Sequence, residues 1–503
     1  MISKTLWMSS VAWVLATGTA AYAQPADTLR VGNWDFPSGR GNPFSSVPGH
    51  PQIYVWSAIF DTMTYVDGKG LPTAGLAQSW RNIDRTTWEF KLRPNVKFSN
   101  GELLDAQAVA DTIAWFKSDA GKTTVGATTF GYVNEAKVID PQTVQFTTSA
   151  PRPIFPVQVS AMYIVPPKAW KEMGVERFST APIGTGSFEA TEWTEQSIKL
   201  KAVPGSWRAP KIGRIEYLRL QEPAARLQAL ASNQIDIMIQ VTPDQVAAVK
   251  GAGASVDVVP SPLLLQLAFV LEGAKAGVDN KMLQDKRVRH ALNHAVDKES
   301  INKNLMGGLF GINTQYSMPI AFGYNPNLKP FEYDPEKAKK LLAEAGYPNG
   351  FSLLAEVRDY PEVMQVVAQD LAKVGVKVEL RPMVMADWLR KFLQNQWDGQ
   401  TFGVTLGVAP ELDTIRMMVF QSCRKNPAYY CNKDLMPLID AIDSEFDSDK
   451  RRAMLHDLMA KMRDDAPAIF LFEQQDLNGI GKRVKGFKNT TRIFNYHELT
   501  LAN

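Results

Sequence analysis

The pattern of apolar and polar positions is clearest in one stretch near the start of the chain. Over residues 88–92 apolar side chains alternate with charged ones, which predicts a strand with one buried face. The alternation resumes over residues 96–98, and Asn100-Gly101 then supplies the residue types of a tight turn. Asp105 stands where a helix cap is expected, before an apolar face over residues 109–116. We therefore expect strand, turn and helix in this order.

Further along the chain, period-two runs alternate with amphipathic helices. The clearest helix has Asp334 as its cap, Pro335 at its first position and Gly346 at its end. Alternation at this spacing predicts an α/β layer with parallel strands. The expected strands are 351–357, 376–381 and 401–408, and the expected helices are 334–346, 362–374 and 386–394.

The remaining elements are less regular. Residues 151–167 hold five prolines and are expected to form an extended crossing segment. Strands are expected over 28–34, 263–270 and 468–472, a hairpin over 138–147, helices over 53–63, 285–300 and 449–464, and a helix leading into a strand over 226–237.

The first 23 residues form a separate segment. Lys4 precedes a short apolar run, and the segment ends with Ala21-Tyr22-Ala23. A basic start, an apolar centre and an A-x-A end predict an export signal that is cut after Ala23. The apolar run is shorter than the roughly 20 residues that span a bilayer, so we expect a periplasmic protein and not an anchored one.

Charge and histidine content limit the classes of function. The net charge of the 503 residues is only +3 and no long charge run occurs, which argues against nucleic acid as a partner. His290 and His294 could share one helix face, but no third metal ligand is evident, so we expect neither a metal nor another cofactor. No catalytic motif such as G-x-S-x-G or H-E-x-x-H is present, so we expect no enzyme.

The two cysteines, Cys423 and Cys431, both follow the leader. In an oxidising compartment, cysteines eight positions apart predict a local disulfide. The alternative is a reactive thiol pair, for which the closer C-x-x-C spacing is typical.

Four sequence motifs resemble one family of proteins. They are LA-x-SW followed by W-x-F-x-LR-x-NVKFSNG, then P-x-GTG-x-F-x-x-x-x-W over 182–193, R-x-x-AL-x-x-x-x-ID over 226–236, and D-x-RVR-x-AL-x-x-A-x-D over 285–297. In this order they resemble the bacterial extracellular solute-binding proteins of family 5, which are peptide- and nickel-type receptors of ABC importers.

The resemblance implies an α/β fold of two lobes that close on a solute (a type II periplasmic binding protein), with a subdomain inserted in lobe I. The segments implied are lobe I over 24–50, 180–262 and 475–503, the insert over 51–179, and lobe II over 263–474. It also implies a monomer, an inner-membrane permease with ATPase subunits as partner, and a disulfide near Cys423 and Cys431, which many members carry. A sensory receptor is the alternative role.

Several residues are candidates for the wall of the cleft. Strand ends, the GTG motif and isolated polar or aromatic positions suggest them. Trp34, Phe36 and Trp397 have core packing as the alternative. The candidates are Asn33, Trp34, Asp35, Phe36, Thr185, Gln266, Trp397, Gly407, Val408, Glu411 and Asp413.

The class of solute depends on one position. In peptide-binding members of the family, an Asp after the strand that corresponds to 401–406 pairs with the amino group of the peptide, and here Val408 occupies that place. A buried ammonium without a carboxylate is costly, so a solute without a free α-amino group, such as a glycoside, an opine-like conjugate or a modified peptide, is one expectation. A shift of the matching to Glu411 or Asp413 would restore the anchor. A peptide remains the leading single class.

Overall fold

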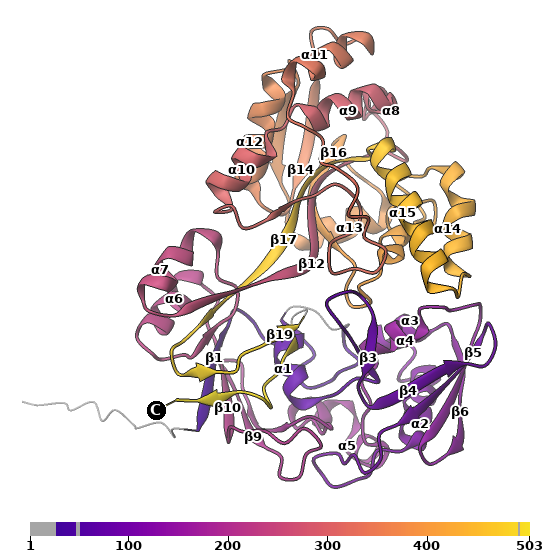
Figure 1. Ribbon diagram of the computed structural model, residues 1–503, viewed down its shortest axis with the longest axis vertical. Coiled ribbons are helices and arrows are strands. Elements are labelled where there is room, and N and C mark those ends of the chain that lie inside the picture. The colour runs from indigo at the N-terminus through magenta and orange to yellow at the C-terminus, as the bar shows by residue number, and fades with distance from the viewer. Residues whose placement is uncertain (1–26, 47–50, 491–492, 503) are drawn as a thin grey trace, which may run out of the picture.

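The computed structural model describes residues 27–46, 51–490 and 493–502. The predicted leader and its cleavage site lie outside these residues. In the described chain, one eleven-stranded sheet extends through both halves of the molecule, in the order β15-β14-β16-β12-β17-β11-β1-β10-β9-β8, with β13 beside β17. Figure 1 shows the two halves, with strands β12 and β17 running from one to the other.

Lobe I is built around the first part of this sheet. Strands β1 and β10 pair in parallel, as do β1 and β11. Its strands are β1 (Thr28–Asn33), β8 (Phe188–Trp193), β9 (Ser197–Ala202), β10 (Arg214–Arg219) and β11 (Ile237–Met238), with helices α6 (Pro223–Ala231) and α7 (Val246–Gly251). Helix α1 (Gln52–Ile59), in the segment expected as the insert, packs against β8. Short strands near the C-terminus complete it: β18 (Val484–Lys485), β19 (Asn489–Thr490), β20 (Ile493–Phe494) and β21 (Thr500–Leu501).

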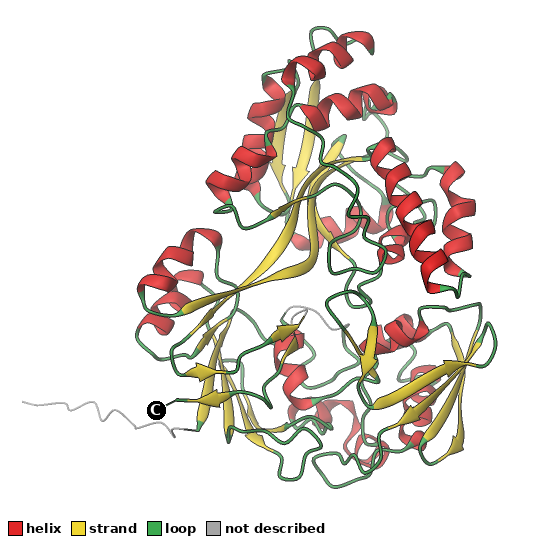
Figure 2. Ribbon diagram, in the orientation of Figure 1, coloured by secondary structure: helices red, strands yellow, loops and turns green. Residues whose placement is uncertain are grey.

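Lobe II carries the other end of the sheet, where β14 pairs in parallel with β15 and β16, as the alternating pattern predicts. Figure 2 shows helices packed around these strands. The strands are β13 (Gly311–Ile312), β14 (Ser352–Val357), β15 (Lys377–Pro382) and β16 (Thr401–Gly407). The helices are α8 (Lys281–Gln284), α9 (Lys286–His294), α10 (Lys298–Leu305), α11 (Pro335–Glu344), α12 (Pro361–Ala372), α13 (Met385–Gln394), α14 (Met436–Asp443) and α15 (Ser448–Asp465).

A four-stranded sheet within the described residues, β4-β5-β7-β6, lies beside lobe I. Strand β5 buries the residues that its alternation predicts, and the Asp105 carboxylate accepts the Ala108 N–H at 2.9 Å as the cap of α2. The apolar residues of this sheet belong to the same buried cluster as those of lobe I. The elements are β2 (Thr64–Val66), β3 (Pro72–Ala74), β4 (Ala77–Asn82), β5 (Thr87–Leu92), β6 (Val133–Asp140), β7 (Thr143–Thr148), α2 (Ala106–Lys117), α3 (Val125–Phe130), α4 (Phe155–Gln158) and α5 (Pro167–Thr180).

The lobes are joined by β12 (Ser255–Phe269) and β17 (Ala468–Ile480), both longer than predicted. The two strands pair antiparallel, and their register shifts between Pro260 and Leu264. Pro260 lies opposite Gln475, whereas Leu264 lies opposite Glu473. Pro260 and Pro262 have no N–H to donate to the ladder, which explains why the irregularity falls at this point. The lobe boundaries expected from the sequence, 262/263 and 474/475, stay a prediction.

Three expected elements differ from the structure. The helix expected over 285–300 is two helices, because the chain breaks after His294 and Asp297 caps α10 by accepting the Ser300 N–H. Residues 151–167 are not simply extended: they contain α4 and a 3-10 turn over Val159–Ala161, and Pro156 and Pro167 occupy first-turn positions where no N–H is needed. Helix α1 ends at Ile59, four residues before the expected end.

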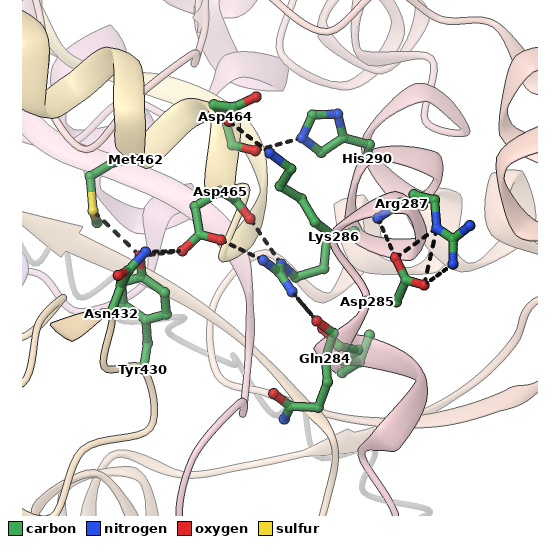
Figure 3. A network of polar contacts seen from close by, with 12 residues as sticks. Gln284, Asp285, Lys286, Arg287, His290, Tyr430, Asn432, Met462, Asp464 and Asp465 are labelled. Atoms are coloured by element: carbon green, nitrogen blue, oxygen red, sulfur yellow. Dashed lines mark hydrogen bonds and ion pairs between the residues drawn. The ribbon is translucent and has the colours of Figure 1, made fainter. Parts of the chain in front are cut away.

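The disulfide between Cys423 and Cys431 is confirmed. The loop that it closes is also held by hydrogen bonds on either side of Cys431. Asp465 accepts from Tyr430 Oη at 2.6 Å and from Asn432 Nδ2 at 3.2 Å (Figure 3). Arg289 from α9 pairs with the same carboxylate. The hydrogen bonds to Asp465 therefore fasten this loop, which the bridge closes, to the end of α15.

We expect the unreduced, denatured protein to show no thiol that reacts with a labelling reagent. Reduction should lower the free energy of unfolding by about 2–3 kcal/mol, because the bridge closes a short loop in the unfolded chain. Two reactive thiols before reduction would contradict the pairing.

Glu473 lies at the register shift of β17, opposite Leu264 on β12 and Gly311 on β13. It is 7% exposed. Burial raises the pKa of the Glu473 carboxyl to about 7, against a hydrogen bond with Tyr324 that lowers it. At the junction of the lobes, this carboxyl is therefore protonated below about pH 7.

The pKa of Glu473 is higher in the folded protein than in the unfolded chain. The stability that its protonated carboxyl contributes is therefore complete at pH 4 and is lost as the pH rises through 7. Glu473→Gln, which stays neutral, should therefore gain stability relative to the parent protein between pH 5 and pH 8. Urea unfolding at both pH values measures this. An unchanged difference between the two proteins would refute the raised pKa.

Candidate solute-binding cleft

A pocket lies between the two lobes, where the buried core of lobe I faces the buried core of lobe II. Its cavity volume is about 50 Å³, and the free space in it with open solvent included is about 690 Å³. We call it the interlobe pocket. Lobe I and the sheet beside it contribute Ile53, Ser57, Phe60, Thr62, Tyr65, Val66, Ser160, Tyr163 and Ile493, whereas Pro262, Ala409, Pro410 and Leu412 come from the crossing strand and lobe II.

The interlobe pocket combines apolar walls with a few polar groups, as small-molecule sites do. Its described lining includes no Asp, Glu, Lys or Arg. The hydroxyls of Ser57 and Ser160 are buried and have no hydrogen-bond partner within the described residues. Two unpaired hydroxyls in an apolar pocket favour a solute that can hydrogen-bond to them.

A buried polar network lies behind one wall of the pocket. Asp61 accepts from Tyr65 Oη at 2.7 Å and from Thr185 Oγ1 at 2.9 Å. Trp207 Nε1 donates to the same carboxylate at 2.8 Å, and Arg208 forms an ion pair with it. Burial raises the pKa of the Tyr65 phenol well above its ordinary value, so the hydroxyl remains a donor. Thr185 therefore holds Tyr65 in place through Asp61 and does not line the pocket itself.

A second hollow, the hinge groove, lies next to the first, since Leu263 lines it and Pro262 lines the interlobe pocket. It contains about 1660 Å³ of free space, including open solvent. Its two walls are the segment after β11 in lobe I and the segment after β14 in lobe II, and the carboxyl ends of parallel strands are where α/β folds bind ligands. Gln240 and Tyr360, one on each wall, have positive φ angles of 57° and 51°. Backbone strain of this kind clusters at functional sites.

Three charged side chains of the hinge groove, those of Arg226, Arg358 and Asp359, are engaged with the protein. Arg226 donates to the carbonyls of Leu220 and Gln221 at 2.7 Å, and burial lowers the pKa of its guanidinium. Arg358 bonds to Asp359 at 3.0 Å, and Asp359 accepts from Thr405 N at 2.8 Å. None of the site residues expected from the sequence lies in this groove, although Tyr360-Pro361 after a predicted parallel strand marks it.

The residues after β1 lie at the edge of the sheet where Gln240 follows β11, since the two strands run in parallel. The Asn33 carboxamide accepts the Trp34 N–H at 2.9 Å, but its Nδ2 and the Trp34 Nε1 are buried without a partner among the described residues. Asp35 pairs with Arg219 at 2.9 Å, and Phe36 belongs to the core of lobe I.

Two candidates lie within lobe II and away from both hollows. Trp397 has no exposed surface and stacks on Phe402 with ring centroids 3.9 Å apart, which favours its core interpretation. Gln266 is also fully buried, in register with Val404 and Phe470 of the neighbouring strands, and neither of its polar atoms has a partner in the described chain.

The segment after β16 approaches the interlobe pocket through its backbone. Gly407 packs closely, because a Cβ there would lie 2.5 Å from the Pro262 carbonyl oxygen. Val408 is fully buried in the core of lobe II. Ala409 and Pro410, the next two residues, form the wall. The wall after β16 is therefore apolar, although Val408 itself does not line it.

The two acids that could replace the missing anchor have partners within the protein. Both oxygens of Asp413 bond to Arg451, at 2.7 and 2.9 Å. Glu411 lies 3.3 Å from Arg416, and burial raises the pKa of its carboxyl against the effect of Arg416. Neither acid belongs to the described lining of the interlobe pocket.

His290 and His294 each bond to a backbone carbonyl. His290 Nε2 lies 2.6 Å from the Asp464 oxygen (Figure 3), and His294 Nδ1 lies 2.7 Å from that of Glu332. Both rings pack edge-on against Phe331. Burial lowers the pKa of each imidazole. The described chain contains no group of three or more His, Cys, Asp or Glu that could hold a metal ion.

We expect Asp413→Asn to lower the free energy of unfolding by about 3–5 kcal/mol, because it leaves the Arg451 charge buried without its partner. Both side chains are less than 5% exposed. The matched control is Asp449→Asn, which removes an exposed pair with Arg452 and should change stability little. A variant as stable as this control that no longer binds solute would instead make Asp413 a ligand anchor.

Comparison with known proteins identifies the family. The model for "Bacterial extracellular solute-binding proteins, family 5 Middle" matches residues 72–426. The glutathione-binding protein GsiB of Pectobacterium atrosepticum is 26% identical over 427 residues, which is 80% of each chain. The dipeptide-binding protein of Escherichia coli K12 is 27% identical over 455 residues, covering 82% of this chain and 83% of that one.

The fold has solved counterparts. The structure of HbpA2 from Haemophilus parasuis superposes with a TM-score of 0.80 at 21% identity, over 95% of this chain and 100% of that one. In the described residues, no helix combines the length and apolar character that crossing a membrane requires. The two-lobed α/β fold and the resemblance found in the sequence are confirmed. The chain belongs to family 5 of the bacterial extracellular solute-binding proteins, and it is a transport receptor and not an enzyme.

Proposed function

We propose that this receptor captures a peptide or a similar small organic solute in the interlobe pocket and releases it to an inner-membrane ABC permease with ATPase subunits. Relatives named for glutathione and dipeptide binding support the peptide class. The proposal includes a monomeric, periplasmic receptor that is cut after Ala23. It also includes the division into lobe I (24–50, 180–262 and 475–503), an inserted subdomain (51–179) and lobe II (263–474).

The observation that carries the proposal is the lining of the interlobe pocket. Both lobes contribute to it, so a bound solute is in contact with each, and it favours the closed arrangement by its contacts to both. The register shift of β12 and β17 is the natural hinge, because the continuous ladder is already interrupted there. The two buried cores lie on either side of this point.

The same lining narrows the class of solute. Because the described wall has no carboxylate, an α-ammonium buried there would lack its counter-charge. We therefore propose a peptide-class solute whose amino group is modified or lies outside the pocket. Its carbonyl or amide groups would pair with the free hydroxyls of Ser57 and Ser160.

A thermal-shift panel of di- to pentapeptides, each free and N-acetylated, with reduced glutathione, tests this proposal. Acetylated peptides should stabilise the protein at least as strongly as the free ones. A solute present at 100 times its Kd adds about 2.7 kcal/mol to the free energy of unfolding. Glu411→Gln should leave these shifts unchanged, as should the surface control Glu336→Gln.

Stabilisation by free peptides only, abolished in Glu411→Gln, would show that an amine anchor exists. No shift with any peptide would exclude the peptide class and favour a glycoside or an opine-like conjugate.

A further inference from the structure

The turn between β2 and β3 presses against lobe II. A Cβ on Gly70 would lie 2.3 Å from Phe322 N and 2.4 Å from the Leu412 carbonyl oxygen. These two atoms are themselves hydrogen-bonded, at 2.8 Å. The Gly70 backbone, with a φ of +74°, therefore lies directly against a backbone hydrogen bond of lobe II, where no side chain fits.

The turn is well ordered by its own hydrogen bonds. The Asp67 carboxylate accepts the N–H groups of Lys69 and Leu71 at 2.8 and 2.9 Å, and the Asp67 carbonyl accepts the Gly70 N–H at 3.1 Å. The contact of Gly70 with lobe II is therefore made by a fixed loop, which needs little ordering when the two surfaces meet.

Around the turn, each half of the molecule packs a side chain against the buried core of the other half. Val66, at the end of β2, is buried in the core of lobe II. In the opposite direction, Phe446 of lobe II packs against the core of lobe I and stacks on Trp88, with ring centroids 6.3 Å apart. Arg85 donates to the Ser444 carbonyl at 2.9 Å and lies 5.6 Å from the Phe446 ring.

These contacts involve no residue that is proposed to bind solute except Val66 and Leu412 at the pocket edge. The inserted subdomain shares its buried core with lobe I, so the two move together when lobe II swings on the hinge. Opening must then separate Gly70 from Phe322 and Leu412, and Phe446 from Trp88.

We propose that residues 66–70, Arg85 and Trp88 form a clasp on Phe322, Leu412 and Phe446 that keeps the receptor closed part of the time without solute. The inference rests on the proposed closing of the lobes. The clasp adds a similar free energy to the binding of every solute, because its contacts, apart from those of Val66 and Leu412, lie outside the pocket. It therefore sets the lifetime of the closed complex and leaves the preference among solutes unchanged.

Three glycine variants test the clasp. Gly70→Ala places a methyl group against lobe II and strains the turn. Gly101→Ala, in the same subdomain, imposes the strain of a positive φ of 90° with no atom within 4 Å of the new Cβ. Gly68→Ala, in the same turn, imposes neither. Gly70→Ala should therefore differ from Gly101→Ala only in lobe closure, and from Gly68→Ala in both lobe closure and backbone strain.

Small-angle X-ray scattering of the solute-free proteins measures that closure. Gly70→Ala should have a larger radius of gyration than the parent protein and both controls, while its unfolding temperature matches that of Gly101→Ala. Identical scattering of all four proteins would overturn the clasp, whether or not a solute is known.

Two further variants test how the clasp affects the affinity of the receptor for solute. Arg85→Ala and Phe446→Ala should each weaken binding of reduced glutathione and of an N-acetylated tripeptide by roughly three- to tenfold, by the same factor for both probes and mainly through faster release. The control is Arg81→Ala, which removes an ion pair within the subdomain.

Failure of the clasp and failure of the proposed function have different signatures. If the parent protein binds neither probe by calorimetry, the proposed solute class is wrong, and the scattering experiment still decides on the clasp. If the parent binds and the Arg85 and Phe446 variants bind equally well, the clasp is wrong and the function stands.

Discussion

The pairing of β12 with β17 is the constraint on which the arrangement of this molecule depends. These strands are the shared part of one sheet, so they fix where the parallel strands of both lobes end. Two prolines, Pro260 and Pro262, interrupt the hydrogen-bond ladder where the chain leaves one core for the other. The connection is therefore continuous enough to align the lobes, and weakened at one place where they can rotate.

Charge is used in this structure to brace the walls of the cleft. Behind the lobe I wall, the Asp61 carboxylate accepts from four donors. Behind the lobe II wall, both oxygens of Asp413 pair with Arg451. Each carboxylate is costly to bury, and each is satisfied by the protein itself. Side chains that face the interlobe pocket are left apolar or hydroxylic, and this separation explains why the pocket is neutral although acids lie close to it.

The sequence predicts the repeating elements well, because alternation and capping are local properties. The cap at Asp105 and the parallel strands β14, β15 and β16 follow directly from such patterns. The break between α9 and α10 was missed, because one amphipathic face continues across both helices and only the Asp297 cap marks the boundary.

The site could be predicted only in part, for a physical reason. A strand end can be located from the sequence, but which neighbouring side chain faces the cleft depends on packing between segments far apart in the chain. Val408 lies where the missing anchor is expected, yet it points into the core and Ala409 and Pro410 form the wall. Thr185 carries a family motif, but its hydroxyl is directed at Asp61, more than a hundred positions earlier.

A neutral pocket also determines how selectivity can arise. Without a charge to pair, the affinity of a solute comes from buried apolar area, which distinguishes shapes only weakly, at about 25 cal/mol per Å². The buried hydroxyls of Ser57 and Ser160 change this balance. A solute that fills the pocket without pairing them leaves polar groups desolvated, at a cost of about 1–3 kcal/mol each, whereas a solute with matching amide groups avoids it. In the proposed site, discrimination would therefore rest on rejecting poorly matched solutes more than on attracting one charged group.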